Sequence, residues 1–242
     1  MSEPLIDLAG VTRQYQRGGE TLRVLDDLDF SMPKGAFYAM MGPSGSGKTT
    51  LLNLLGGLDR ADGGQVLVGG EDLAQMDGPE LAAWRSVHVG FVFQGFNLIP
   101  VLNAIENLEL ALLLTPLSKR DRRQHAEHAL ELVGLKDRMK HKPKELSGGQ
   151  EQRVAIARAI VTDPELILAD EPTGDLDRTS ALQILGLLQK LNTELDKTIL
   201  MVTHDPVAAE HAHCTAHLDK GKLGRIEQNA AGRATADAAL AE

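Results

Sequence analysis

Short apolar runs bounded by turn residues occupy most of the first hundred residues. Such runs, when clusters of glycine, proline or other turn residues separate them, predict β-strands. The predicted strands are residues 5–12, 22–31, 36–41, 66–68 and 87–93. Leucine recurs on one face of residues 48–58, which predicts a helix that begins directly after a glycine-rich turn.

In the middle of the chain, the apolar positions change to the spacing of a helix face, roughly 3.6 residues. This period predicts amphipathic helices. The predicted helices are residues 103–113, 119–133 and 147–161. We expect them to form a helical subdomain, at about residues 100–162, that is inserted between strands.

Residues 166–170 and 198–203 are nearly all apolar, as expected of parallel strands that are covered on both faces. Residues 180–192 are predicted to form the crossover helix between them. The sequence therefore predicts an α/β fold with a mainly parallel sheet, an antiparallel β portion near the N-terminus and a helical insertion. We expect one domain over residues 1–228. The alanine-rich residues 229–242 carry no core pattern and are expected to be frayed or disordered.

The chain of 242 residues has a formal net charge of −9. Wrapping of nucleic acid requires clustered Lys and Arg, so we expect no nucleic-acid partner, and binding to anionic lipid by charge alone is disfavoured. No apolar run approaches the ~20 residues that span a bilayer, so a membrane role would come through a partner. A single cysteine, Cys214, rules out an intrachain disulfide and favours a reducing compartment.

Residues 42–49 match the pattern G-x-x-x-x-G-K-[ST] in full and lie between a predicted strand and a predicted helix. Glycines let backbone N–H groups approach phosphate oxygens closely, and the N-terminus of the following helix favours an anion. Lys48 would place its charge on the β- and γ-phosphates, and the Thr49 hydroxyl can bind Mg²⁺. The predicted ATP-binding residues of this phosphate loop are Gly42, Pro43, Ser44, Gly45, Ser46, Gly47, Lys48, Thr49 and Thr50.

Two carboxylates, Asp170 and Glu171, lie at the end of the apolar run 166–170. In a protein with a phosphate loop, Asp170 at this strand end can hold Mg²⁺ directly or through water. Glu171, one residue further on, points elsewhere and can accept a proton from an attacking water. A pair of solvated carboxylates without a function is the alternative, and the complete phosphate loop disfavours it.

A second glycine motif, Leu-Ser-Gly-Gly-Gln at residues 146–150, directly precedes a predicted helix. Helix capping by its serine would explain the motif, but a second anion-binding helix N-terminus in one chain asks for a further reason. This motif, placed between the phosphate loop and the acidic pair, resembles the signature of the ATP-binding cassette family. The signature residues are Ser147, Gly148, Gly149 and Gln150. The resemblance covers roughly residues 5–227.

The resemblance also implies roles for single residues whose signals are weak alone. Tyr15 resembles the aromatic residue that stacks on adenine, and Gln94 resembles the glutamine that meets Mg²⁺ and the attacking water. His204 resembles the switch histidine that touches the γ-phosphate, and Asp175 and Asp177 resemble the D-loop. The implied catalytic residues are Lys48, Gln94, Glu171 and His204. The implied Mg²⁺ ligands are Thr49, Gln94 and Asp170.

In this family, two cassettes pack head to tail, and each ATP lies between the phosphate loop of one chain and the signature of the other. The resemblance therefore implies an ATPase that needs Mg²⁺ and a second copy of itself. Residues 93–100 and 169–177 resemble the LolD/MacB group, which powers export or extraction through a separate membrane subunit. That subunit would dock at residues 94–100 and hold the chain at the cytoplasmic face of the membrane. The apolar residues expected at this docking surface are Phe96, Leu98, Ile99 and Pro100.

An importer ATPase and a cell-division ATPase that signals across the membrane stay open as alternatives. A DNA-maintenance ATPase would carry a long coiled coil between its motifs, but Gln94 and Ser147 are separated by only 147 − 94 = 53 residues. A regulatory module without hydrolysis would be expected to lack Lys48 or Glu171. His211, His213, Cys214 and His217 are candidate ligands of a soft metal. Their spacing matches no standard zinc motif and His217 is expected in a strand, so a structural or incidental cluster is favoured.

Overall fold

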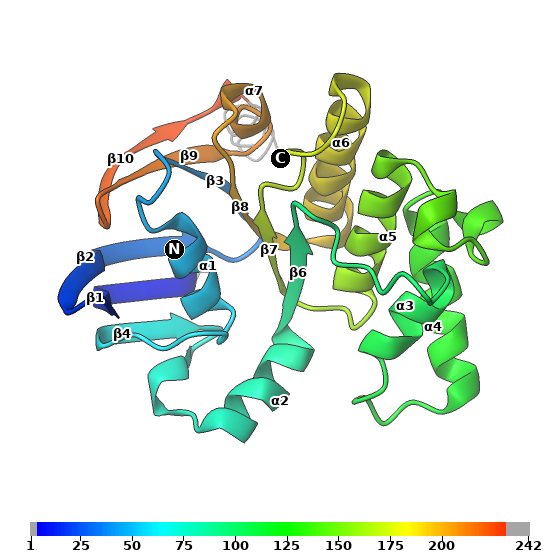
Figure 1. Cartoon of the computed structure of the whole chain (residues 1–242), viewed down its shortest axis with the longest axis horizontal. Helices are drawn as coiled ribbons and strands as arrows, with labels where there is room; N and C mark the ends of the chain where they lie inside the picture. Colours follow the sequence, from blue (N-terminus) through cyan, green and yellow to red (C-terminus); the bar gives the residue numbers. More distant parts are fainter. Residues whose placement is uncertain (1–3, 231–242) are drawn as a thin grey trace, which may run out of the picture.

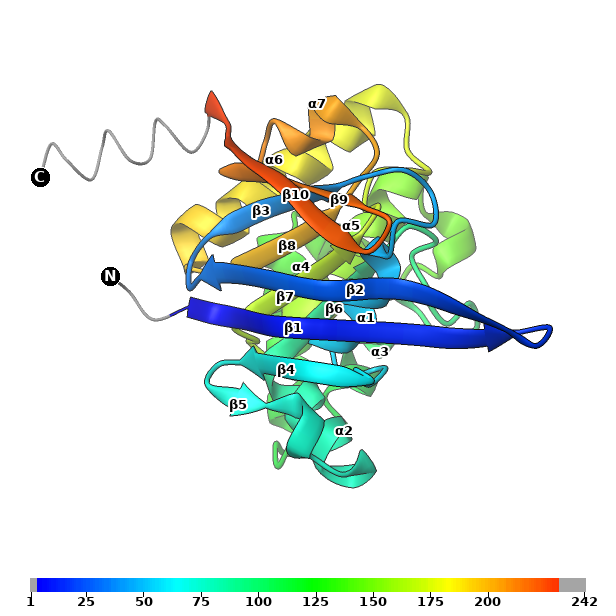
Figure 2. The ribbon, with the colours of Figure 1, turned by 90° about the vertical axis from the view of Figure 1, so that its left-hand side faces the viewer.

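The computed structural model describes residues 4–230, which form two β-sheets with helices between and beside them (Figure 1). The first sheet is antiparallel, with the strand order β2-β1-β4-β5. Its strands are β1 (Pro4–Arg17), β2 (Glu20–Pro33), β4 (Gly63–Val68) and β5 (Glu71–Asp72). The β1–β2 hairpin is longer than predicted and extends beyond the neighbouring elements at one end (Figure 2).

The second sheet has the order β10-β9-β3-β8-β7-β6. All its neighbouring strands are parallel except the edge pair β9 and β10, which is antiparallel. Its strands are β3 (Phe37–Met41), β6 (Val89–Phe93), β7 (Leu166–Asp170), β8 (Thr198–Val202), β9 (Cys214–Asp219) and β10 (Lys222–Gln228). Both sheets together confirm the predicted α/β class with an antiparallel portion near the N-terminus.

Within residues 4–230, seven α-helices connect or cover the strands, as Figure 1 shows. They are α1 (Lys48–Leu55), α2 (Gly78–His88), α3 (Ala104–Ala111), α4 (Lys119–Leu132), α5 (Gly148–Ile160), α6 (Arg178–Leu195) and α7 (Pro206–Ala209). The described part of the chain also has short 3₁₀ helices, which are η1 (Leu73–Gln75), η2 (Lys136–Arg138) and η3 (Pro143–Glu145). Helices α3, α4 and α5 pack against one another where the helical insertion was predicted.

The inner strands β3, β7 and β8 of this sheet are covered on both faces, which explains why they are nearly all apolar. Along β7, Leu166 and Leu168 pack into a core with α1 and the antiparallel sheet. Ile167 and Ala169, which point to the other face, pack into a second core with α5, α6 and the helical subdomain. Helices α1 and α5 therefore lie in different layers, on opposite faces of this sheet.

Helix α2 was not predicted, and the strand expected from residue 87 begins only at Val89. The helix starts at a capping box, in which Asp77 Oδ1 accepts from Glu80 N and Glu80 Oε2 accepts from Asp77 N, both at 2.8 Å. Its buried residues are Leu81 and Trp84 alone, so its apolar period is weak. The capping pattern, rather than the apolar pattern, was the available signal.

Residues 231–242, most of the segment predicted to be frayed, lie outside the described residues. Asn229, the first residue of that segment, is well anchored, because its Nδ2 donates to the carbonyls of Ala209 (2.9 Å) and Ala212 (3.0 Å). Over residues 4–230, none of the helices is both long enough and apolar enough to cross a bilayer.

Candidate functional site

The phosphate loop joins β3 to α1, and its conformation requires glycine at both ends. A Cβ added to Gly42 would stand 2.0 Å from the Leu218 carbonyl oxygen, and one added to Gly47 would stand 2.7 Å from the Val24 carbonyl oxygen. Gly47 also has a φ of 105°, which L-residues rarely adopt. The backbone can therefore turn its N–H groups toward a bound anion, as the sequence pattern predicted.

The phosphate loop encloses the ammonium of Lys48 and the hydroxyl of Ser46. Lys48 is 8% exposed, and its Nζ donates to the carbonyls of Gly42 (2.7 Å) and Pro43 (2.9 Å). The Ser46 hydroxyl is buried and has no hydrogen-bond partner among the described residues. Buried polar groups are normally paired, so a phosphate oxygen would fit here as the acceptor for this hydroxyl and for the ammonium. Thr49 and Thr50 follow in the first turn of α1.

Thr49 and Asp170 come together at the ends of α1 and β7. Thr49 Oγ1 donates to Asp170 Oδ2 at 3.2 Å. Burial raises the pKa of Asp170, and the charge of Glu171 raises it further, whereas the Thr49 hydrogen bond and the charge of Lys48 oppose the rise. A bound divalent cation would offset both the cost of burying the Asp170 charge and the repulsion between the Asp170 and Glu171 carboxylates. Hydroxyl and carboxylate oxygens are also ligands that Mg²⁺ prefers. These two side chains therefore fit a magnesium site.

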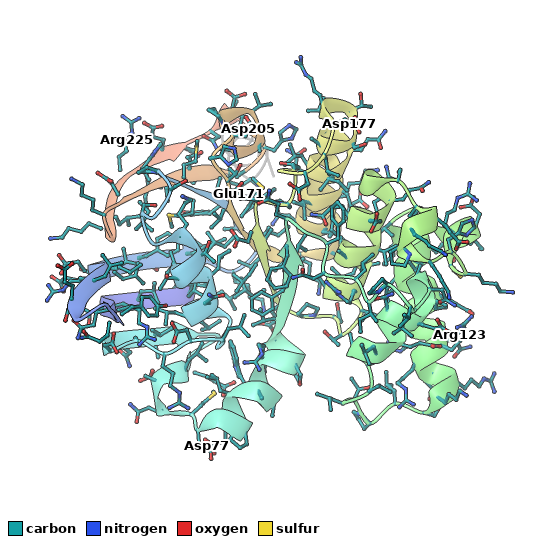
Figure 3. The ribbon with its side chains drawn as sticks, viewed as in Figure 1. Asp77, Arg123, Glu171, Asp177, Asp205 and Arg225 are labelled. Atoms are coloured by element: carbon teal, nitrogen blue, oxygen red, sulfur yellow. The ribbon has the colours of Figure 1, made fainter. Side chains whose placement is uncertain are left out.

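Glu171 turns away from the strand that Asp170 ends. Its φ is 47°, which is uncommon for a residue other than glycine, and its N–H donates to the Val202 carbonyl at 2.9 Å. Figure 3 places Glu171 in the middle of the molecule, where β7 and β8 end. Its Oε2 lies 2.8 Å from His204 Nδ1. The structure therefore brings the predicted base and the predicted switch histidine into direct contact.

Gln94 follows β6 and contacts the D-loop rather than the magnesium pair. Its Nε2 donates to Asp175 Oδ1 at 2.7 Å, and no hydrogen bond between described residues joins it to Thr49 or Asp170. Its role as a metal ligand stays a prediction. Asp177 caps α6, because its Oδ1 accepts from the N–H groups of Thr179 and Ser180, each at 3.0 Å.

The signature motif caps α5. Ser147 Oγ accepts from Gln150 N at 3.4 Å, and Gln150 Oε1 accepts from Ser147 N at 3.0 Å. Gly149 lies against α6, where an added Cβ would stand 2.9 Å from Ser180 Oγ. Because α5 and α1 lie on opposite faces of the sheet, the motif does not face the phosphate loop of its own chain (Figure 1). Within one chain, only the capping role is realised.

Tyr15 lies near the phosphate loop because the β1–β2 hairpin places it there. Tyr15 pairs with Leu22 across the hairpin, and Val24, two residues along β2, contacts Gly47. Two residues of strand span roughly 7 Å. The Tyr15 ring thus lies on the part of the hairpin next to the phosphate loop, where it is suitably placed to meet the base of a bound nucleotide.

Sequence reasoning missed two buried or half-buried side chains on α5 that hold the loops of the site. Gln152 is fully buried, and its Nε2 donates to the carbonyls of Pro172 (2.6 Å) and Phe93 (3.2 Å). Arg158 donates to the carbonyls of Phe96 (3.0 Å) and Asn97. The available signal was a polar residue at an otherwise apolar helix position. Its partners could not be read from the sequence, because they lie on distant segments.

Two of the candidate soft-metal ligands near the C-terminus, His211 and His213, have other partners. His213 Nδ1 accepts from Phe37 N at 3.2 Å, and burial lowers the pKa of this imidazole. His211 Nδ1 lies 3.1 Å from Gln189 Oε1. Over the described part of the chain, no three His, Cys, Asp or Glu side chains converge on a metal position.

Comparison with known proteins gives consistent matches over the whole cassette. The sequence profile of the family described as ABC transporter matches residues 25–174. The lipoprotein-releasing system ATP-binding protein LolD of Chromohalobacter salexigens is 45% identical over 92% of this chain and 94% of its own. The macrolide export ATP-binding/permease protein MacB 1/2 of Paracoccus denitrificans is 46% identical over 91% of this chain, which spans 33% of that longer protein.

Among solved structures, the chain is similar to the ATP-binding cassette MJ0796, a dimer in a post-hydrolysis state bound to ADP and Pi. The TM-score is 0.84 and the identity 42%, over 92% of this chain and 98% of that one.

Proposed function

The chain belongs to the ABC transporter family, and we propose that it is the ATP-hydrolysing subunit of a LolD/MacB-type complex that exports or extracts a substrate through a separate membrane subunit. The observation that carries hydrolysis is the 2.8 Å contact between Glu171 and His204, beside the pair Thr49 and Asp170. A carboxylate that is oriented by a histidine next to a phosphate-binding loop is suited to take a proton from water.

The site residues divide the reaction among them. Lys48 and the loop N–H groups would hold the β- and γ-phosphates and stabilise the charge that moves in the transition state. Thr49 and Asp170 would hold Mg²⁺, which when bound neutralises phosphate charge. Glu171 would accept the proton of the attacking water, with His204 fixing the direction of the carboxylate.

We infer that the working form is a homodimer. The signature Ser147–Gln150 and the phosphate loop lie on opposite faces of one sheet, so a nucleotide that contacts both must lie between two chains. The dimeric state of the similar cassette MJ0796 supports this arrangement. Gln94 would have to leave Asp175, its partner at 2.7 Å, to reach the attacking water.

A chain with Ser147→Arg is expected to be inactive alone, because the arginine obstructs the nucleotide bound to the other chain. Mixed in equal amounts with Lys48→Ala chains, it should recover about a quarter of the wild-type rate, since half of the dimers are mixed and each has one complete site. Steady-state ATP hydrolysis of the mixture measures this recovery.

Ser118→Arg is the matched control, because Ser118 caps α4 as Ser147 caps α5, with Asp121 N donating to its Oγ at 3.2 Å. Loss of a helix cap alone would affect both variants alike. If Ser147→Arg chains hydrolyse ATP at the wild-type rate, the site shared between two chains is refuted.

The membrane subunit is proposed to dock where α2, α3 and α5 meet the segment after Gln94. A cavity of about 300 Å³ there has apolar walls from Phe91 and Phe93, with Arg85 at its edge. The surface expected at residues 94–100 is divided: Leu98 packs against the core of the helical subdomain, whereas Ile99 is exposed.

Asn107 fixes the exposed part of this surface. It is 1% exposed, its Oδ1 accepts from Ile99 N at 2.7 Å, and its Nδ2 donates to the Ile99 carbonyl at 3.3 Å. Val101, two residues further on, is 72% exposed. Apolar side chains that a fixed backbone holds at the surface support a contact with a partner protein.

Ile99→Asp is therefore expected to weaken binding to the co-purifying membrane subunit about tenfold or more, because it buries a charge in an apolar contact. ATP hydrolysis by the isolated subunit should change less than twofold. Leu195→Asp, at a similarly exposed leucine at the far end of α6, is the control. Recovery of the Ile99→Asp complex at wild-type yield would exclude this surface.

A further inference from the structure

A cluster of charged side chains surrounds Tyr15 at the outer part of the β1–β2 hairpin. Arg13 donates to Asp59 through Nε (3.0 Å) and Nη2 (2.8 Å), and to Asp62 Oδ1 through Nη1 (3.0 Å). The Tyr15 hydroxyl donates to Asp59 Oδ2 at 2.6 Å. Asp59 is thus the common acceptor for the guanidinium and the phenol.

This cluster fixes both the direction and the accessible face of the aromatic ring. The Arg13 guanidinium carbon lies 4.6 Å from the centre of the Tyr15 ring, in a cation–π contact that covers one face. Tyr15 as a whole residue is still 36% exposed. Burial alone would raise the pKa of Asp59, but the hydrogen bond from Tyr15 and the pairing with Arg13 lower it. The acceptor for the phenol is therefore ionised at neutral pH.

The same cluster connects the ring to the helix that starts at the phosphate loop. Asp59 N donates to the carbonyl of Asn53, in the last turn of α1, at 3.2 Å. Asp62 Oδ2 accepts from Gln14 N at 2.7 Å, which attaches the same turn to β1. The far end of the phosphate-binding helix and the tyrosine are thus held in one hydrogen-bonded unit.

We propose that Arg13 and Asp59 are positioning residues that preset Tyr15 to stack on the base of the nucleotide, and so determine affinity for the base rather than for the phosphates. The proposal rests on ATP binding at the phosphate loop, as proposed above. One ring face is occupied by Arg13, so the opposite face is left for the base. A ring held in place by Asp59 loses less conformational freedom on binding than a free one.

The experiment compares binding of Mg-ATP and of magnesium tripolyphosphate, which has the phosphates but no base, by isothermal titration calorimetry. Asp59→Ala is expected to weaken ATP about tenfold, within the range of a lost base–aromatic stack, and to change tripolyphosphate less than twofold. In a Tyr15→Ala background, Asp59→Ala should cause no further loss, because it acts through the ring.

Arg23→Gln is the matched control, because Arg23 pairs with Asp26 at 2.7 Å on the same hairpin without contacting Tyr15. Asp59→Asn, a milder variant, serves if Asp59→Ala does not fold. Equal weakening of both ligands would show a purely structural role and overturn the proposal. An undiminished tenfold effect in the Tyr15→Ala background, or no effect of Tyr15→Ala on ATP, would also overturn it. ATP hydrolysis that depends on Lys48 would stand in either case.

Discussion

Replacement of Glu171 by glutamine is expected to slow ATP hydrolysis by about 10²–10⁴-fold, the usual effect of losing a general base. Glutamine retains the size of the side chain and an oxygen for His204, which lies 2.8 Å from Glu171 Oε2, but cannot accept the proton of water. Binding should survive, because Lys48, Thr49 and Asp170 are unchanged. It is expected to be tighter, because one negative charge near the γ-phosphate is removed.

The measurement combines turnover with light scattering. Slow hydrolysis should let the closed dimer accumulate, so ATP should shift Glu171→Gln from monomer to dimer more strongly than wild type. Glu165→Gln, at the opposite end of β7, is the control, since Glu165 only pairs with Lys34 at 3.3 Å on the surface. Turnover at the wild-type rate would transfer the base role elsewhere, with His204 as the next candidate. Loss of ATP binding would show that the carboxylate is structural.

Lys48→Ala is expected to abolish measurable ATP turnover by removing phosphate binding, an effect of about 10²-fold or more. The ammonium is nearly buried and is held by two loop carbonyls, at 2.7 and 2.9 Å, so it is already placed where the phosphates would lie. No neighbouring cation in the loop can replace it. Steady-state hydrolysis and calorimetric ATP binding measure the loss.

Lys197→Ala is the matched control for this change. Lys197 is also about as buried, at 9% exposed, and pairs with Asp163 at 2.6 Å, but lies away from the phosphate loop. It should lower stability and leave hydrolysis close to normal. Near-normal hydrolysis by Lys48→Ala itself would refute the assignment of the phosphate loop.

The elements that the sequence predicted well are those whose surroundings are uniform. Strands β7 and β8 are covered on both faces, so almost every residue is apolar and the pattern is unambiguous. Strand β10 has mostly exposed residues and was not predicted. Helix α2 buries few side chains, so only its cap identified it.

In the site, too, groups that are contiguous in the sequence could be predicted, whereas groups whose partners are distant in the sequence could not. The phosphate loop and the acidic pair have their chemistry in contiguous residues, so the sequence could predict them. The contact between Glu171 and His204 joins two residues whose roles the family resemblance implied and which stay predictions. Gln152 and Asp59 could not be found this way, because their hydrogen-bond partners lie on other segments of the chain.

Helix α5 begins at the signature motif and, near its other end, holds the loop after Gln94 through Arg158. Ten residues of α-helix separate Gly148 from Arg158, a rigid arm of about 15 Å. A tilt of this arm by about 10° when a nucleotide is gripped at one end would move the other end by roughly 2–3 Å. The arm would thus couple the two sites: the same displacement that closes around ATP in one chain would move the surface that we propose for the membrane subunit, in a direction perpendicular to the helix axis.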